Sequence, residues 1–274
     1  MRFEEFARAH GLIIRNVVQN RWVKTPTEDH PKSDNGSYKF IGHVGWVQNW
    51  ATMDKPATWF DENTKVDGKE RFRQMQNKDN QQAELAEKAA KKAGWIMHQT
   101  VLEEHPYLKA KGFDTEKGNV WHKNGEALLV IPLRINGNIV GVQLINSNGE
   151  KKFLYGQTTK GATFTIDAKG FPIFCEGYAT GLAIRDALKF SNIKYCIHVC
   201  FSASNMKLIA RNVRDGIIVA DNDPNHIGEI TAWEANKPYW ISPTVGDDFN
   251  DFWKRVGTAQ ASASLRKVVD RFVM

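Results

Sequence analysis

The chain has 274 residues, of which 42% are hydrophobic and 25% charged, a composition ordinary for a soluble protein with one large or two modest domains. No stretch approaches the roughly 18 apolar residues of a membrane helix, and the acidic start MRFEEFARAH is unlike a signal peptide, so we expect a cytoplasmic protein with no membrane partner. Three cysteines argue against a disulfide framework or a four-cysteine zinc ribbon, and the net charge of +6 is a weak indication of a nucleic-acid partner.

The first sixty residues predict a small β-rich module that follows a short helix. Residues 2–10 place apolar side chains on one helical face and end at Gly11, a common helix stop. The segment RWVKTPTEDHPKSDNGSYKFIGHVGWVQNW then alternates aromatic or β-branched residues with polar ones between Pro and Gly breaks, which predicts an antiparallel sheet. Its aromatic and basic side chains suit either a minimal core or a platform for single-stranded DNA, with the candidates Trp22, Lys24, Tyr38, Lys39 and Trp46.

A polar connector and a second β-rich segment come next. Residues 61–98 hold few large apolar side chains, which indicates a loop and a solvated helical connector whose helix ends at Gly94. Residues 99–165 begin with a helix and turn at HPYLKAKG and continue with the strands ALLVIPLRI, IVGVQLI and KKFLYG. We expect this basic subdomain to form a meander.

From residue 166 to residue 256 the pattern alternates strand and helix. The near-continuous apolar strands FPIFC, YCIHVCF and GIIVA are separated by segments with helical spacing. This order is typical of an α/β domain with a small parallel sheet flanked by helices. Residues 257–274 predict a C-terminal helix that either packs on the core or binds a partner.

Acidic residues follow three of the predicted strands. Glu176 comes after FPIFC, Asp221 and Asp223 come after GIIVA, and GDDFND, which contains Asp248, follows the next strand. Parallel strands end at one edge of a sheet, so we expect these carboxylates to converge there, which is unfavourable unless a cation binds among them. Oxygen ligands point to Mg²⁺ or Mn²⁺, and no zinc is expected.

Each acidic element also has a purely structural interpretation. The carboxylate of Glu176 could complement a helix dipole, DNDP could form a turn with Asx hydrogen bonds, and DDFND could begin a helix with an Asp cap. Three such elements at one edge of a sheet nevertheless favour a metal site.

The same residues resemble a known family. CEGYATGLAI, VADNDPNHIG and GDDFNDFW are similar, in this order, to the three acidic motifs of the Toprim domain of bacterial-type (DnaG-like) primases carried by plasmids and phages. With HPYLKAKG and LLVIPLRINGNIVGVQLINSNGEKKFLYG upstream, the resemblance covers about residues 100–256.

The resemblance implies a DNA primase, a DNA-directed RNA polymerase that synthesises short RNA primers on single-stranded DNA in phage or plasmid replication. It implies catalytic roles for Glu176, Asp221 and Asp223, and metal binding by these three residues together with Asp248. The residues that would contact the nucleotide or the template are Lys111, Arg134 and Lys152. Implied partners are single-stranded DNA, ribonucleoside triphosphates and, as a candidate, a replicative helicase, in the cytoplasm of a bacterial host cell.

The sequence differs from this family in its N-terminal region. Residues 1–60 contain no cysteine, whereas primases of this type often carry an N-terminal zinc ribbon, so we expect a ribbon-like sheet without zinc. Two alternatives stay open. The chain could be a Toprim-type metal-dependent nuclease, or a catalytically inactive Toprim protein that binds nucleic acid.

Overall fold

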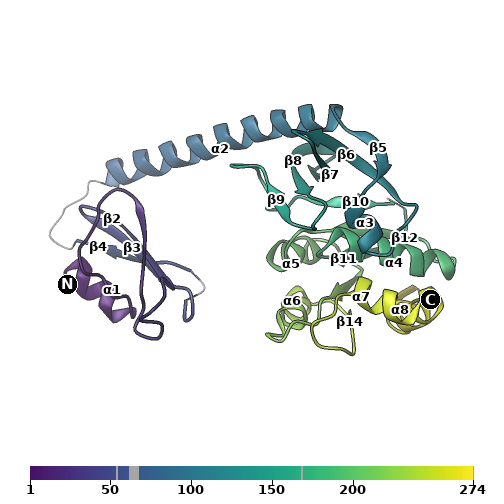
Figure 1. Ribbon diagram of the computed structural model, residues 1–274. Coiled ribbons are helices and arrows are strands. Elements are labelled where there is room, and N and C mark those ends of the chain that lie inside the picture. The colour runs from purple at the N-terminus through teal and green to yellow at the C-terminus, as the bar shows by residue number, and fades with distance from the viewer. Residues whose placement is uncertain (54, 62–67, 168, 274) are drawn as a thin grey trace. The chain divides into compact units, whose positions relative to one another are not determined.

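The computed structural model describes residues 1–53, 55–61, 68–167 and 169–273. The chain divides into two compact units, Met1–Asn77 and Lys78–Met274, each of which is described by itself (Figure 1). Residues 62–67 of the predicted connector lie outside the described residues. None of the described helices combines the length and the apolar character that crossing a bilayer requires.

The first unit is a four-stranded antiparallel sheet with one short helix packed against it. The strands occur in the order of the sequence, and the elements are α1 (Phe3–Ala9), β1 (Trp22–Thr25), β2 (Gly36–Ile41), β3 (Val44–Asn49) and β4 (Ala57–Phe60). Apolar side chains from one sheet face meet those of α1 and form the core, which includes Phe3, Ala7, Leu12, Tyr38, Val47 and Trp59. A Cβ atom at Gly45 would lie 2.2 Å from the Phe3 ring, so a glycine is needed there for the helix to sit this close to the sheet.

Helix α2 (Gly68–His98) runs four residues beyond the predicted end at Gly94. Ala93 and Ile96 are fully buried against strands of the second unit, together with Trp121 and Val142. Burial of this apolar face outweighs the roughly 1 kcal/mol by which a glycine disfavours a helix interior, so the helix continues.

The second unit begins with a five-stranded antiparallel sheet whose strands also follow the order of the sequence. The three predicted strands are present as parts of it, and two further strands that the sequence analysis did not predict precede them. The elements are β5 (Val101–Glu104), α3 (Pro106–Ala110), β6 (Lys117–Lys123), β7 (Glu126–Ile135), β8 (Asn138–Ile145) and β9 (Lys151–Phe153).

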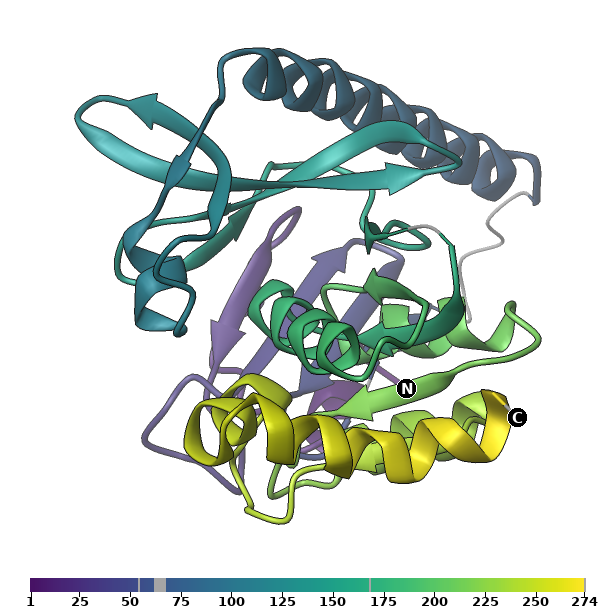
Figure 2. The ribbon, with the colours of Figure 1, turned by 90° about the vertical axis from the view of Figure 1, so that its right-hand side faces the viewer.

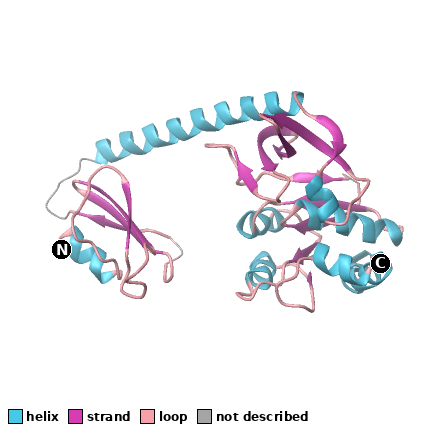
Figure 3. Ribbon diagram, in the orientation of Figure 1, coloured by secondary structure: helices cyan, strands magenta, loops and turns pink. Residues whose placement is uncertain are grey.

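A second sheet of five strands, in the order β10-β12-β11-β13-β14, completes this unit (Figure 3). Four of its strands are parallel, and β10 pairs antiparallel with β12 at one edge. The strands are β10 (Phe164–Ile166), β11 (Phe171–Cys175), β12 (Tyr195–Val199), β13 (Ile217–Ala220) and β14 (Tyr239–Ile241).

Helices cover both faces of this parallel sheet. On one face lie α4 (Tyr178–Phe190), α7 (Phe249–Val256) and α8 (Thr258–Val273), with α4 and α8 side by side (Figure 2). On the other face lie α5 (Ala203–Arg211) and α6 (Ile227–Ala235). Successive residues of β13 alternate between the two cores, as strand geometry requires. The predicted fold class, an α/β domain with a parallel sheet behind a β-rich N-terminal region, is confirmed.

Candidate metal and nucleotide site

The carboxyl edge of the parallel sheet carries two of the predicted acidic residues. Glu176 directly follows β11, and Asp221 directly follows β13. These strands are hydrogen-bonded neighbours in parallel, with Ile173 opposite Ile217, so both carboxylates leave the sheet at the same edge. This is the edge at which open α/β sheets bind ligands.

Glu176 is held between the sheet and the start of α5. Its carbonyl oxygen accepts a hydrogen bond from the Phe201 N–H at 2.9 Å, and the backbone of Ala203 acts to lower the pKa of its carboxyl. Burial and the nearby charge of Asp223 raise the pKa of the Glu176 carboxyl, although Lys151 opposes this shift. The side chain is therefore desolvated, close to a second carboxylate and within reach of a lysine.

Among the predicted acidic residues, Asp221 has a buried carboxylate oxygen, Oδ1, that lacks a hydrogen-bond partner among the described residues. Burial, followed by the charges of Asp248, Glu176 and Asp223, raises the pKa of the Asp221 carboxyl to about 7. A buried carboxylate oxygen without a partner is unfavourable, and a bound cation would relieve both the desolvation and the repulsion.

The donor chemistry at this edge fits a hard divalent cation, but the side chains are not arranged as a finished coordination sphere. Among the described residues, no group of three or more His, Cys, Asp or Glu side chains is placed to hold a metal ion. The carboxylates influence one another electrostatically, and the unpartnered Oδ1 of Asp221 is the atom most in need of a cation. Carboxylate oxygens with room for water are the ligands that Mg²⁺ and Mn²⁺ accept.

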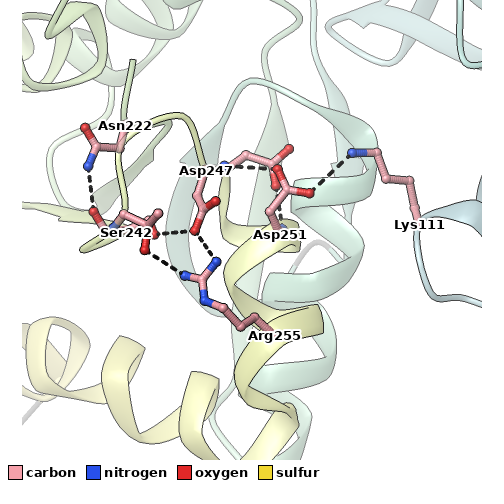
Figure 4. Close-up of polar contacts among 8 residues, drawn as sticks. Lys111, Asn222, Ser242, Asp247, Asp251 and Arg255 are labelled. Carbon is pink, nitrogen blue, oxygen red and sulfur yellow. Dashed lines mark hydrogen bonds and ion pairs between the residues drawn. The ribbon is translucent and has the colours of Figure 1, made fainter. Parts of the chain in front are cut away.

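In the third acidic motif, Asp248 and Asp251 form the cap of α7, and Asp248 also affects the acidic site. Asp248 caps α7, because its Oδ1 atom accepts the Asp251 N–H at 2.9 Å, so the alternative structural interpretation of this motif, a helix start with an Asp cap, applies to this side chain. The Asp251 carboxylate in turn accepts the Asp248 N–H at 3.4 Å, and its Oδ1 atom lies 3.8 Å from Lys111 Nζ (Figure 4). Asp248 nevertheless acts on Asp221 through its charge.

Asp247 is committed to ordering the loop between β14 and α7. Its Oδ2 atom accepts from Arg255 at 2.6 Å and from Ser242 Oγ at 3.1 Å (Figure 4). Its backbone carbonyl accepts the Asn222 N–H, and the Asn222 side chain donates to the Ser242 carbonyl at 2.8 Å. These bonds tie the loop that carries Asp248 to the segment that carries Asp221.

A cleft of about 380 Å³ lies next to the third motif. Its walls come from α3, the β8–β9 turn and α7, and the lining residues are Tyr107, Ala110, Lys111, Ser147, Asn148, Gly149, Lys151 and Lys254. Two of its lysines have partners, because Lys111 lies near Asp251 and Lys254 donates to the Ala110 carbonyl. Lys151 forms no ion pair with any described side chain. Its positive charge acts to lower the pKa values of Glu176 and Asp221, which burial and the neighbouring carboxylates raise.

The predicted basic residues have different positions in the second unit. Lys111 lines the cleft. Lys152 alternates with Lys151 along β9 and lies in a separate cleft of about 310 Å³ that also contains Lys123. Arg134 is exposed and donates to the Gly137 carbonyl at its own hairpin. Lys151, which the sequence analysis passed over, is the lysine whose charge reaches the carboxylates, and only the register of β9 reveals this.

The first unit separates the predicted aromatic residues into two groups. Trp22 lies opposite Lys39, and Lys39 lies opposite Trp46, so these three residues share one sheet face with Lys24. Trp22 is 52% exposed, and Phe60, a residue absent from the prediction, is 46% exposed on the same face.

The prediction for Tyr38 is wrong. Its ring lies on the opposite sheet face and is 2% exposed within the core. Its hydroxyl donates to the Asn16 carbonyl at 3.0 Å and accepts the Val18 N–H at 3.1 Å. The ring cannot stack on a base without leaving the core, and the period-two alternation of β2 is the signal that separates it from Lys39.

Residues 172–259 match the Toprim domain family, and this stretch, less than half of the chain, contains all four predicted acidic residues. No curated protein sequence matches the chain significantly.

Solved primase structures resemble the chain distantly. The primase fragment of the bacteriophage T7 primase-helicase protein has 16% identity and a TM-score of 0.42, over 59% of this chain and 69% of that one. A chain in a T7 complex of lagging-strand DNA polymerase with primase domains has the same identity and TM-score, over 59% and 84%. The Escherichia coli primase catalytic core has 14% identity and a TM-score of 0.35, over 66% and 59%. Likenesses this weak concern the fold and carry no argument about activity.

Proposed function

We propose that the chain is a primase, a nucleotidyltransferase that joins ribonucleotides into short RNA primers on single-stranded DNA in phage or plasmid replication. The observation that carries the proposal is the buried, unpartnered Oδ1 of Asp221, set among three further carboxylates next to a lysine-lined cleft. Acidic groups that need a cation, beside basic groups that need an anion, suit a metal-dependent reaction of a nucleoside triphosphate.

In this proposal the carboxylates bind the metal ion and the lysines bind the phosphates of the nucleotide. Glu176, Asp221, Asp223 and Asp248 would hold Mg²⁺ or Mn²⁺, which stabilises the attacking and leaving oxygens of a phosphoryl transfer when bound. The raised pKa of Glu176 suits a carboxylate that accepts the proton of the attacking 3′-hydroxyl. Lys111 and Lys151 line the cleft in which the triphosphate would bind, and their charges would balance its phosphates.

The remaining partners follow from the reaction. A primase needs a single-stranded DNA template and ribonucleoside triphosphates, and we include a replicative helicase as a further candidate partner in the cytoplasm of a bacterial host. The exposed face of the first unit, with Trp22, Lys24, Lys39 and Trp46, is proposed to bind the template. No zinc is assigned to this unit.

The test is a priming assay with single-stranded DNA, labelled ribonucleotides and Mg²⁺ or Mn²⁺. We expect new oligoribonucleotides from the unmodified chain and none from Asp221→Asn or Asp223→Asn. Asp215→Asn is the matched control, because Asp215 is exposed at the opposite end of β13. Shortened DNA in place of new RNA would indicate the nuclease alternative. DNA binding without either product would indicate an inactive binding protein.

A further inference from the structure

A short turn after β9 displays an aromatic side chain on a firmly held backbone. Tyr155 is 86% exposed. The turn is held by Gln157, whose Oε1 atom accepts the Leu154 N–H at 3.2 Å and the Val142 N–H at 3.0 Å. Gly156, at φ +78°, packs so closely on α2 that a Cβ atom there would lie 2.8 Å from Leu85 Cβ. The exposure of Tyr155 is therefore a property of an ordered turn.

A second exposed aromatic ring connects this turn to the acidic edge. Phe153 is 43% exposed and lies edge-on to Phe201, with ring centroids 6.2 Å apart. The Phe201 N–H donates to the carbonyl of Glu176 at 2.9 Å. Phe153 therefore contacts Phe201, which is hydrogen-bonded to the backbone of the predicted catalytic residue Glu176. Tyr155 lies two residues after Phe153 in the chain.

Lysines flank the two rings. Lys151 and Lys152 precede them, Lys160 follows them, and all three are exposed. Lys151 is also the lysine whose charge reaches Glu176 and Asp221. Exposed aromatic rings between lysines match the chemistry of single-stranded nucleic acid, whose bases stack on rings while its phosphates pair with ammonium groups.

We propose that the segment 151–160 is a base-stacking step that holds the single-stranded DNA template beside the acidic edge, an inference that rests on the proposed function. Tyr155 stacks on one template base, and Phe153, supported by Phe201, continues the step toward Glu176. Lys160 pairs with a flanking template phosphate, whereas Lys151 remains assigned to the triphosphate in the cleft. This segment belongs to the second unit, whereas the sheet face that carries Trp22 belongs to the first.

The experiment combines a positional and an energetic readout on the full chain. Single-stranded DNA containing 5-iododeoxyuridine is bound, irradiated and digested with trypsin, and the cross-linked peptide is identified by mass spectrometry. Cleavage after Lys152 and Lys160 gives the peptide FLYGQTTK, which contains both rings. The affinity for the same DNA is measured by fluorescence anisotropy.

We expect a cross-link in residues 153–160 that is lost in Tyr155→Ala and kept in Tyr155→Phe. Tyr155→Ala should also weaken DNA binding by at least about fivefold, the lower limit of one stacking contact. The control is Phe190→Ala, because Phe190 is 64% exposed but ends α4, about 18 Å along the helix from its start next to Glu176. This variant should match the unmodified chain.

The outcomes separate this inference from the proposed function. Primer synthesis without a cross-link in residues 153–160, or with unchanged affinity in Tyr155→Ala, would overturn the stacking step and leave the primase proposal intact. The expected cross-link and loss of affinity in a chain that makes no primers would support the step and refute the primase proposal. An unmodified chain that binds no single-stranded DNA would overturn the stacking step, whether or not primers form.

Discussion

Asp248 caps helix α7 and also raises the pKa of the Asp221 carboxyl, although the two residues are 27 positions apart in the chain. The cap fixes the orientation of Asp248, and the bonds of Asn222 and Asp247 fix the loop that brings it near Asp221. A structural and an electrostatic role therefore coincide in one side chain, and the two can be separated by substitution.

Asp248→Asn should remove the charge and keep the cap, because Asn and Asp are similarly good N-cap residues. We expect the free energy of unfolding to change little in Asp248→Asn and to fall by about 1 kcal/mol in Asp248→Ala. Primer synthesis should drop by about tenfold or more in both variants. Urea unfolding and the priming assay measure the two effects. Full activity in Asp248→Asn would reduce this residue to a cap.

The metal-free chain should lose stability as the pH rises. The pKa of Asp221 is about 7 in the folded protein and near 3.8 in the unfolded chain, so between these values the folded state keeps a proton that the unfolded state has lost. This contribution is fully present below the unfolded pKa and is lost as the pH rises through about 7.

We therefore expect the difference in unfolding free energy between the unmodified chain and Asp221→Asn to change by about 2 to 3 kcal/mol between pH 5 and pH 8 in EDTA. Millimolar Mg²⁺ should restore stability at the higher pH in the unmodified chain and not in Asp221→Asn. Asp215→Asn serves as the control and should follow the unmodified chain. A parallel pH dependence in all three proteins would contradict the assignment of the buried carboxyl.

The two lysines of β9 provide a matched pair. Lys151 lines the cleft next to the third acidic motif, whereas Lys152 lies in the other cleft. Lys151→Ala should raise the KM for ribonucleotides by about tenfold, since a bond to a charged phosphate is lost, while Lys152→Ala should change it much less. Steady-state priming kinetics measure both. Equal KM values for the two variants would show that the face of the strand does not matter.

The first unit separates stacking from core packing. Trp22→Ala and Trp46→Ala should each weaken binding of single-stranded DNA by about fivefold or more, and the affinity should fall as salt is added. Tyr38→Phe should instead destabilise the fold by about 1 to 3 kcal/mol, because two backbone groups lose their hydroxyl partner. Anisotropy titrations and urea unfolding give the two quantities. Unchanged affinity in both Trp variants would refute the platform.

The local sequence pattern was sufficient to predict those elements whose formation depends on residues close together in the chain. The alternation of strands and helices after residue 166 and the antiparallel sheet of the first unit were predicted from spacing and turn residues, and the Asp cap of α7 was one of two interpretations of its motif. The end of α2 was missed, because tertiary burial of Ile96 overrides the local effect of Gly94. Tyr38 was misassigned, because composition does not say which face of a strand becomes the core.

The sequence by itself determined which acidic residues are candidates for the site. Glu176 and Asp221 directly follow the strands β11 and β13, and the parallel order of these strands puts both residues at one edge of the sheet. Only the tertiary structure decided which of them are desolvated, which are bound to a neighbour and which lysine faces them. Burial and charge coupling depend on distances between segments remote in the chain. Packing and strand register set those distances, and residue spacing does not encode them.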